Sequence, residues 1–155
     1  MNGDPLPAAH GFPARLIVPG LYGYVSATKW LIEIELTTFD EFDQYWVRRG
    51  WDEEAPIKTM ARIDTPRTLA ALDAGTNVIG GVAWAQTRGI AKVEVAIDDG
   101  EFAEAVLADE HNLHTWRQWS LPWEATSGGH GITVRATDAA GELKTDERAE
   151  PFPNG

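Results

Sequence analysis

Short apolar–polar alternations separated by turn residues restrict most strongly what this chain can fold into. Strand-like segments lie at residues 57–64, 77–85, 90–98, 116–123 and 131–138, and the alternation itself is clear at residues 90–98 and 131–138. A period of two places alternate side chains on opposite faces of a strand, so these two segments predict half-buried strands. Several short strands with turns between them are typical of an antiparallel β-sandwich. The sequence therefore predicts a mainly β domain over residues 56–155.

Turn and breaker residues add detail to this prediction. Asp98-Asp99-Gly100 is a strong turn signal after the third segment. The pair Gly80–Gly81 predicts a bulge in the second segment. Residues 101–108 favour a helix by propensity and an edge strand by position. Because the sequence contains no cysteine, no Trp–Cys spacing marks an antibody domain, and the prediction stops at an Ig-like sandwich.

The first 55 residues have a different character. Residues 2–13 contain three prolines and two glycines, which predicts a loop or an extended arm. Residues 14–18 predict a short strand. Residues 38–55 are acidic and aromatic without a clear period, which predicts a connector with one helical turn.

The clearest alternation in the whole chain lies in this first part. Trp30, Ile32, Ile34 and Leu36 alternate with Leu31, Glu33 and Glu35. The pattern predicts a half-buried strand with the first set on its buried face.

Composition excludes several classes of protein. Lysine and arginine number 13 against 24 aspartate and glutamate residues, a formal charge of −11. This balance argues against bulk nucleic-acid binding, which needs a basic face. No apolar run approaches the roughly 20 residues of a membrane span, and no signal-peptide pattern opens the chain. The compartment stays open; the chain is compatible with the extracytoplasmic part of a membrane-anchored or exported bacterial enzyme.

Candidate metal or catalytic side chains are few. The absence of cysteine removes disulfides, zinc–thiolate sites and thiol nucleophiles. His111 and His114 have a spacing that suits two metal ligands on a helix, but two imidazoles do not close a site, and a surface loop is favoured. His130 is interpreted as a loop histidine, and Asp98 and Asp99 as turn residues.

The tryptophans can be interpreted either as core residues or as a ligand-binding surface. Five lie mainly on strand patterns: Trp30, Trp84, Trp116, Trp119 and Trp123. Core packing is favoured for them. A carbohydrate-binding surface built from Trp116, Trp119 or Trp123 is the alternative.

Three basic side chains near the start of the chain stand out. His10 and Arg15 occur in the run HGFPAR, and Lys29 follows in the pair KW. An arginine provides a bidentate fork for a phosphate, and a lysine provides a point charge. The surrounding prolines and glycines restrict the loop, so less entropy is lost when a ligand binds.

The segments that carry these residues resemble a known family. The run NGDPLPAAHGFPARLIVPG at residues 2–20, followed by Tyr22-Gly23 and by SATKWL at residues 26–31, resembles the end of the molybdenum-pterin domain of the sulfite oxidase family. The later elements GVAW at residues 81–84 and VEV at residues 93–95, with Trp116 and Trp119 beyond them, resemble the family's C-terminal dimerisation domain.

The resemblance implies a domain division and a set of site residues. Residues 1–55 would be the C-terminal part of the α+β molybdopterin-binding domain with a connector, and residues 56–155 the Ig-like dimerisation domain without its final strand. His10, Arg15 and Lys29 match positions that contact the pterin and its phosphate. Ser26 and Thr28 lie in the same loop and offer further contacts. Arg88 lies near the place of an arginine that binds the anionic substrate in some members.

The resemblance also implies what the chain lacks. The family ligates molybdenum through a cysteine thiolate, which this sequence does not contain. We therefore expect a C-terminal fragment of a molybdenum oxidoreductase that acts on a small molecule such as sulfite. The missing N-terminal catalytic half would be its partner, and the sandwich would form a homodimer. Alone, the chain would retain neither metal nor molybdopterin and would not catalyse. The alternative is a non-catalytic β-sandwich module that binds a partner or a carbohydrate.

Overall fold

The computed structural model describes residues 3–144 and 150–153. The chain divides into two compact units, one comprising Met1–Ile57 with Ala149–Gly155 and the other comprising Lys58–Arg148.

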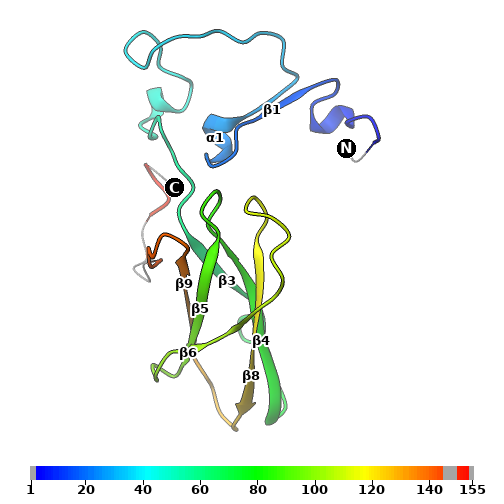
Figure 1. Cartoon of the computed structure of the whole chain (residues 1–155), viewed down its shortest axis with the longest axis vertical. Coiled ribbons are helices and arrows are strands. Elements are labelled where there is room, and N and C mark those ends of the chain that lie inside the picture. Colours follow the sequence, from blue (N-terminus) through cyan, green and yellow to red (C-terminus); the bar gives the residue numbers. More distant parts are fainter. Residues whose placement is uncertain (1–2, 145–149, 154–155) are drawn as a thin grey trace. The chain divides into compact units, whose positions relative to one another are not determined.

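The unit Lys58–Arg148 is a β-sandwich of two antiparallel sheets (Figure 1). The four-stranded sheet has the order β3-β4-β8-β7, with β3 at Met60–Thr65, β4 at Gly75–Trp84, β8 at Arg117–Ala125 and β7 at Val106–Leu107. The three-stranded sheet has the order β6-β5-β9, with β6 at Ala103–Glu104, β5 at Ile90–Ile97 and β9 at Ile132–Asp138. The mainly β fold class predicted from the alternating segments is confirmed.

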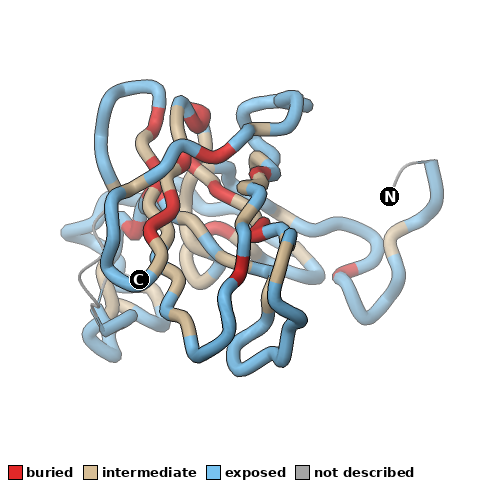
Figure 2. The backbone as a smooth tube through the Cα atoms, turned by 90° about the horizontal axis from the view of Figure 1, so that it is seen from below, coloured by how far each residue is buried: buried red, intermediate tan, exposed pale blue. Residues whose placement is uncertain are grey.

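Alternate side chains of both sheets form the core of the sandwich. Ile79 and Trp119 come from the four-stranded sheet, and Val93, Val95 and Ala136 from the three-stranded sheet. Each is almost completely buried, as the period-two pattern requires when one face of each sheet is covered. Figure 2 shows buried positions on several stretches of the chain, while the stretch beside the N-terminus is mostly exposed.

Residues 101–108 resolve the ambiguity between a helix and an edge strand. They form β6 and β7, two edge strands that belong to different sheets. Ala105 between them is buried and donates its backbone N–H to the Val93 carbonyl, 2.9 Å away. Because the chain changes sheets at Ala105, neither strand is long enough to show a clear period.

The glycine pair marks a bulge, but on the opposite strand. The β3–β4 register shifts between Ile63 and Thr65 of β3, which face Gly81 and Gly80 of β4. The expected bulge within the glycine-containing strand was therefore wrong in position: β4 runs straight, and β3 takes the extra residue.

The other unit contains short elements only. These are η1 at Ala8–His10, β1 at Arg15–Ile17, α1 at Gly23–Ser26, β2 at Ala27–Lys29 and η2 at Val47–Arg49. Trp51 packs against Tyr24 and Phe152, with ring centroids 5.0 and 5.5 Å apart. Among the residues placed by the structure, no helix has the length and apolar character needed to cross a membrane.

The strand predicted at residues 30–36 was wrong. β2 ends at Lys29, and residues 31–38 have no regular structure. Ile32, Ile34 and Leu36 are 97%, 68% and 96% exposed. An alternating sequence becomes a strand only when a neighbour accepts its backbone hydrogen bonds and a second layer covers its apolar face. Leu31 donates its N–H to the Ala14 carbonyl at 3.4 Å, but among the described residues no backbone hydrogen bond and no covering layer is found for residues 32–37.

Candidate functional site

The predicted cofactor residues lie around the antiparallel pair β1–β2. Arg15 of β1 is the register partner of Lys29 of β2, and Leu16 is the partner of Thr28. Residues directly opposite each other in an antiparallel pair share a face, with Cβ atoms about 5 Å apart. Arg15 and Lys29 therefore stand side by side on one face, and Thr28 belongs to the other.

The HG element places His10 beside the same hairpin. Lys29 Nζ donates to the Ala9 carbonyl and Trp30 Nε1 to the Ala8 carbonyl, each at 3.0 Å. Gly11 has a φ of 112°, and a Cβ there would come within 3.1 Å of the Lys29 Cα. Glycine after His10 thus permits both the left-handed turn and the close approach of η1 to the lysine. The loop that carries His10 therefore lies against the strand that carries Lys29.

Two like charges directly opposite each other are unfavourable in an isolated hairpin. Within residues 3–144 and 150–153, neither Arg15 nor Lys29 forms an ion pair with a carboxylate. The Lys29 ammonium lies 5.8 Å from the centre of the Trp30 ring. A guanidinium and an ammonium side by side suit an anion such as a phosphate, which would offset their repulsion.

Ser26 has a local structural partner. Its side chain is buried, and Oγ donates a hydrogen bond of 3.0 Å to the Leu21 carbonyl across α1. The Ser26 carbonyl accepts a hydrogen bond of 2.9 Å from the Val18 N–H. This bond holds the end of β1 beside the start of β2. Ser26 thus shapes the hairpin that carries Arg15 and Lys29.

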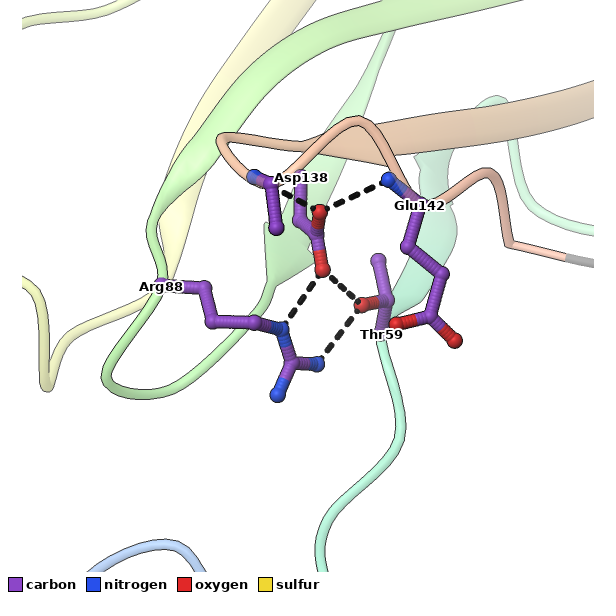
Figure 3. A network of polar contacts seen from close by, with 5 residues as sticks. Thr59, Arg88, Asp138 and Glu142 are labelled. Carbon is purple, nitrogen blue, oxygen red and sulfur yellow. Dashed lines mark hydrogen bonds and ion pairs between the residues drawn. The ribbon is translucent and has the colours of Figure 1, made fainter.

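Arg88, predicted as a substrate residue, lies in a network inside the sandwich unit (Figure 3). It follows β4, and its Nε donates to Asp138 Oδ2 at 2.6 Å while Nη2 donates to Thr59 Oγ1 at 2.9 Å. Thr59 Oγ1 in turn donates to the same Asp138 oxygen at 3.1 Å. The N–H groups of Ala140 and Glu142 donate to Asp138 Oδ1. Two of the three guanidinium nitrogens are therefore engaged within the chain.

Asp138 is charged in this network. Its side chain has no exposed surface, and burial alone would raise its pKa. The hydrogen bond from Arg88, with those from the Glu142 N–H, the Thr59 hydroxyl and the Ala140 N–H, more than compensates and lowers the pKa below the ordinary range. Sequence reasoning missed Thr59 and Asp138, because nothing in the local pattern marks them as partners of Arg88.

A second network joins two loops of the sandwich. His130 Nδ1 lies 2.6 Å from Asp98 Oδ2, and the Gly131 N–H donates to Asp98 Oδ1 at 2.8 Å. The hydrogen bond to Asp98 raises the pKa of His130, and the same bond lowers the pKa of Asp98. The turn at Asp98 was predicted correctly, but its pairing with a histidine far along the chain was not.

The remaining histidines and tryptophans do not form a ligand site. His111 and His114 are exposed, and the described residues contain no group of three metal-ligating side chains. Trp119 is buried in the core, as predicted. Trp30 and Trp116 are more than half exposed, so core packing was wrong for these two. With Trp119 buried and Trp123 packed against the core, the tryptophans of β8 form no shared exposed surface for a carbohydrate.

Comparison with known proteins assigns these elements to a family. Residues 1–46 match the model of the oxidoreductase molybdopterin binding domain. The mitochondrial sulfite oxidase of Mus musculus is 32% identical over 146 residues, which cover 78% of this chain and 26% of that protein. The uncharacterized oxidoreductase YuiH of Bacillus subtilis is 44% identical over 50 residues, covering 32% of this chain and 24% of that protein.

The fold agrees with the sequence comparison. The crystal structure of the sulfane dehydrogenase SoxCD from Paracoccus pantotrophus superposes with a TM-score of 0.74 at 22% identity, covering 92% of this chain and 40% of that chain. The chain spans about a quarter of the length of the mouse enzyme. The match to the cofactor-domain model, the sulfite oxidase relatives and the shared fold together show that this chain belongs to the sulfite oxidase family of molybdopterin-dependent oxidoreductases.

Proposed function

We propose that this chain contributes pterin contacts and subunit pairing to a larger molybdenum oxidoreductase of the sulfite oxidase type. The observation that carries the proposal is the register of β1–β2, which sets Arg15 directly opposite Lys29. Two cations held together at the expense of mutual repulsion indicate an anionic ligand. The terminal phosphate of molybdopterin has the charge and the acceptor oxygens that this pair would bind.

The residues present fit the organic part of this cofactor. Arg15 would bind the phosphate through its fork, Lys29 would add a point charge, and His10 lies beside them as a ring donor. Ser26 would hold the hairpin in shape, and Thr28, whose side chain lies on the other face, would contribute through its backbone. The bound molybdenum centre would supply the redox chemistry. No cysteine in this sequence would ligate the metal, so its thiolate would come from another part of the protein.

The domain assignment is part of the proposal. Residues 1–55 would complete the molybdopterin-binding domain, and residues 56–155 would form the Ig-like dimerisation domain. The exposed side chains of Ile32, Ile34 and Leu36 support this assignment, because such a row is stable only when another layer covers it. We expect the catalytic half of the protein to provide that layer. The substrate would be a small molecule, with sulfite as the first candidate and Arg88 as a candidate contact.

The pterin contacts can be tested by measuring the weak binding of a pterin to the isolated chain. The probe is the oxidised, fluorescent form of molybdopterin with its phosphate, titrated into the isotope-labelled 155-residue chain and followed by NMR. We expect amide shifts centred on Arg15 and Lys29 with a dissociation constant of about 1 mM, near −4 kcal/mol. The same pterin without its phosphate should bind at least about tenfold more weakly.

Charge-removing variants complete the test. Arg15→Gln and Lys29→Gln should each abolish the shifts, whereas Arg67→Gln, which removes an arginine from the other unit, should leave them unchanged. Binding that ignores the phosphate, or that survives both hairpin substitutions, would contradict the proposed contacts.

A further inference from the structure

One end of the sandwich contains a cavity between its two sheets. Its volume is about 530 Å³, within the range of sites that bind small molecules. Ile63 of β3 and Trp123 of β8 line the cavity from the four-stranded sheet, and Ile132 of β9 lines it from the three-stranded sheet. The loops that follow β3 and β8 complete its lining.

The walls of the cavity are apolar and incompletely covered. Ile63, Trp123 and Ile132 pack against the core, yet all three are only half-buried. Leu72, from the loop after β3, also lines the cavity and is 46% exposed. An apolar group in the cavity would remove more of this surface from water, and the gain in free energy is proportional to the area covered. A ligand for this cavity therefore needs an apolar body.

Two aromatic rings of the wall are held in fixed positions. The rings of Trp123 and His130 lie at 85° to each other, with centroids 5.2 Å apart. His130 Nδ1 lies 2.6 Å from Asp98 Oδ2, and Nε2 lies 3.1 Å from the Thr126 carbonyl, so both ring nitrogens are occupied. His130 thus contributes a ring surface and not a free donor. A ring face beside a ring edge suits a further aromatic ring.

A cation lies beside this apolar space. Arg67 lines the cavity and is exposed, and its guanidinium has no carboxylate partner among the residues that the structure places. The Ala70 N–H donates to the Arg67 carbonyl at 2.9 Å, which closes the turn that carries this side chain. Acidic residues outnumber basic ones by 24 to 13 in the chain, so an arginine left for a ligand is a local exception to its charge.

The loop after β8 leaves room for a ligand. Gly128 and Gly129 line the cavity, and a Cβ at either position would meet no atom within 4 Å. A ligand can therefore approach the backbone of this loop closely.

We propose that this cavity binds an aromatic monocarboxylate, with its ring among Ile63, Trp123 and Ile132 and its carboxylate on the Arg67 guanidinium. A guanidinium binds a carboxylate through two parallel N–H···O bonds, which a neutral amide cannot match. One cation beside apolar walls suits a single negative charge, because any further charge would lose its water without gaining a partner. The cavity belongs to the sandwich unit and uses none of the residues proposed to contact the pterin, so this inference goes beyond the proposed function.

The cavity can be tested with 3-phenylpropionate as the probe, titrated into the isotope-labelled 155-residue chain and followed by NMR. We expect shifts centred on the Trp123 indole N–H and on the amides of Gly128 and Gly129, with a dissociation constant of about 1 mM. Two related compounds separate the contributions of ring and charge. 3-Phenylpropionamide has the ring without the charge, and acetate has the charge without the ring. Each should bind at least about tenfold more weakly.

Variants place the probe in the cavity. Arg67→Gln should weaken 3-phenylpropionate about tenfold and leave 3-phenylpropionamide unchanged, whereas Arg62→Gln, at an arginine outside the cavity, should change neither. Leu72→Asp would add a carboxylate beside the probe and should abolish its binding. Leu113→Asp is the matched control, since Leu113 is 43% exposed and does not line the cavity. Circular dichroism verifies that each variant is folded.

Four results would overturn the proposal. The probe could cause no shift at Trp123, or the amide could bind as tightly as the carboxylate. Arg67→Gln could bind the probe as well as the unchanged chain does. Acetate could also bind as tightly as the probe, which would show a simple anion site without recognition of the ring. None of these results bears on the pterin contacts, whose titration reports on the other unit.

Discussion

Nε of Arg88 donates a hydrogen bond of 2.6 Å to Oδ2 of Asp138, a carboxylate with no exposed surface and fifty positions away in the sequence. The bond connects the turn after β4 with the end of β9, and thus joins the two sheets of the sandwich. A charged group of this kind is stable inside a protein only while its partners are present.

Removing the guanidinium therefore destabilises the sandwich. We expect Arg88→Gln to lower the free energy of unfolding by roughly 2–3 kcal/mol, because Asp138 keeps its burial and loses its cation. Arg62→Gln is the control, since its ion pair with Asp64 is about half exposed, and it should cost under about 1 kcal/mol. Urea titrations give both values. Equal losses would show that the Arg88 bond contributes no more than a surface pair.

The pair His130–Asp98 makes stability depend on pH. The hydrogen bond to Asp98 raises the pKa of His130, so the folded state holds the imidazolium more tightly than the unfolded state. This contribution is complete below the ordinary histidine pKa of about 6.5 and is lost as the pH rises through the raised pKa. We expect the stability difference between the chain and His130→Gln to shrink as the pH rises above about 6.5 in urea titrations. A difference that stays constant over this range would contradict the pairing.

Two adjacent glycines should respond very differently to alanine. A Cβ on Gly81 would overlap the Arg62 carbonyl oxygen, whereas a Cβ on Gly80 would lie 3.2 Å from the Trp119 carbonyl oxygen. We expect Gly81→Ala to cost about 2–4 kcal/mol, because strands β3 and β4 must separate, and Gly80→Ala under about 1 kcal/mol. Thermal unfolding of the two variants distinguishes them. Similar melting temperatures would contradict the close approach of β3 at Gly81.

Alanine substitutions at a buried and at an exposed isoleucine should differ in their effect on stability. Ile79 is fully buried and Ile32 is 97% exposed. We expect Ile79→Ala to lower the free energy of unfolding by about 2–4 kcal/mol through lost burial and a residual cavity. Ile32→Ala should change it by less than about 0.5 kcal/mol in the isolated chain. A large loss in Ile32→Ala would show that residues 31–38 pack in solution.

The sandwich strands could be predicted because their signal is local. The segments at residues 77–85 and 131–138 differ from β4 and β9 by only one or two residues at their ends. Alternation and flanking glycines act over a few residues, so they are visible without a fold. The pattern at Trp30–Leu36 was the clearest of all and gave the wrong result. Alternation indicates that one face of a segment is apolar, but it does not show whether another layer is present to cover that face.

The candidate site was likewise predicted from the sequence only in part. The residue types in HGFPAR and KW are enough to indicate an anion, since a guanidinium and an ammonium have that chemistry wherever they lie. The register that sets Arg15 opposite Lys29 was not visible in the sequence, because it depends on the length of the turn through α1.

By itself the sequence determined the main strands of the sandwich, the turn at Asp98 and the basic residues near the start of the chain, all of which follow from the chemistry of neighbouring residues. Only the tertiary structure decided that Asp138 pairs with Arg88 and that Asp98 pairs with His130. These relationships depend on which strands lie beside each other, and residues 30 to 50 positions apart carry no local signal of their contact.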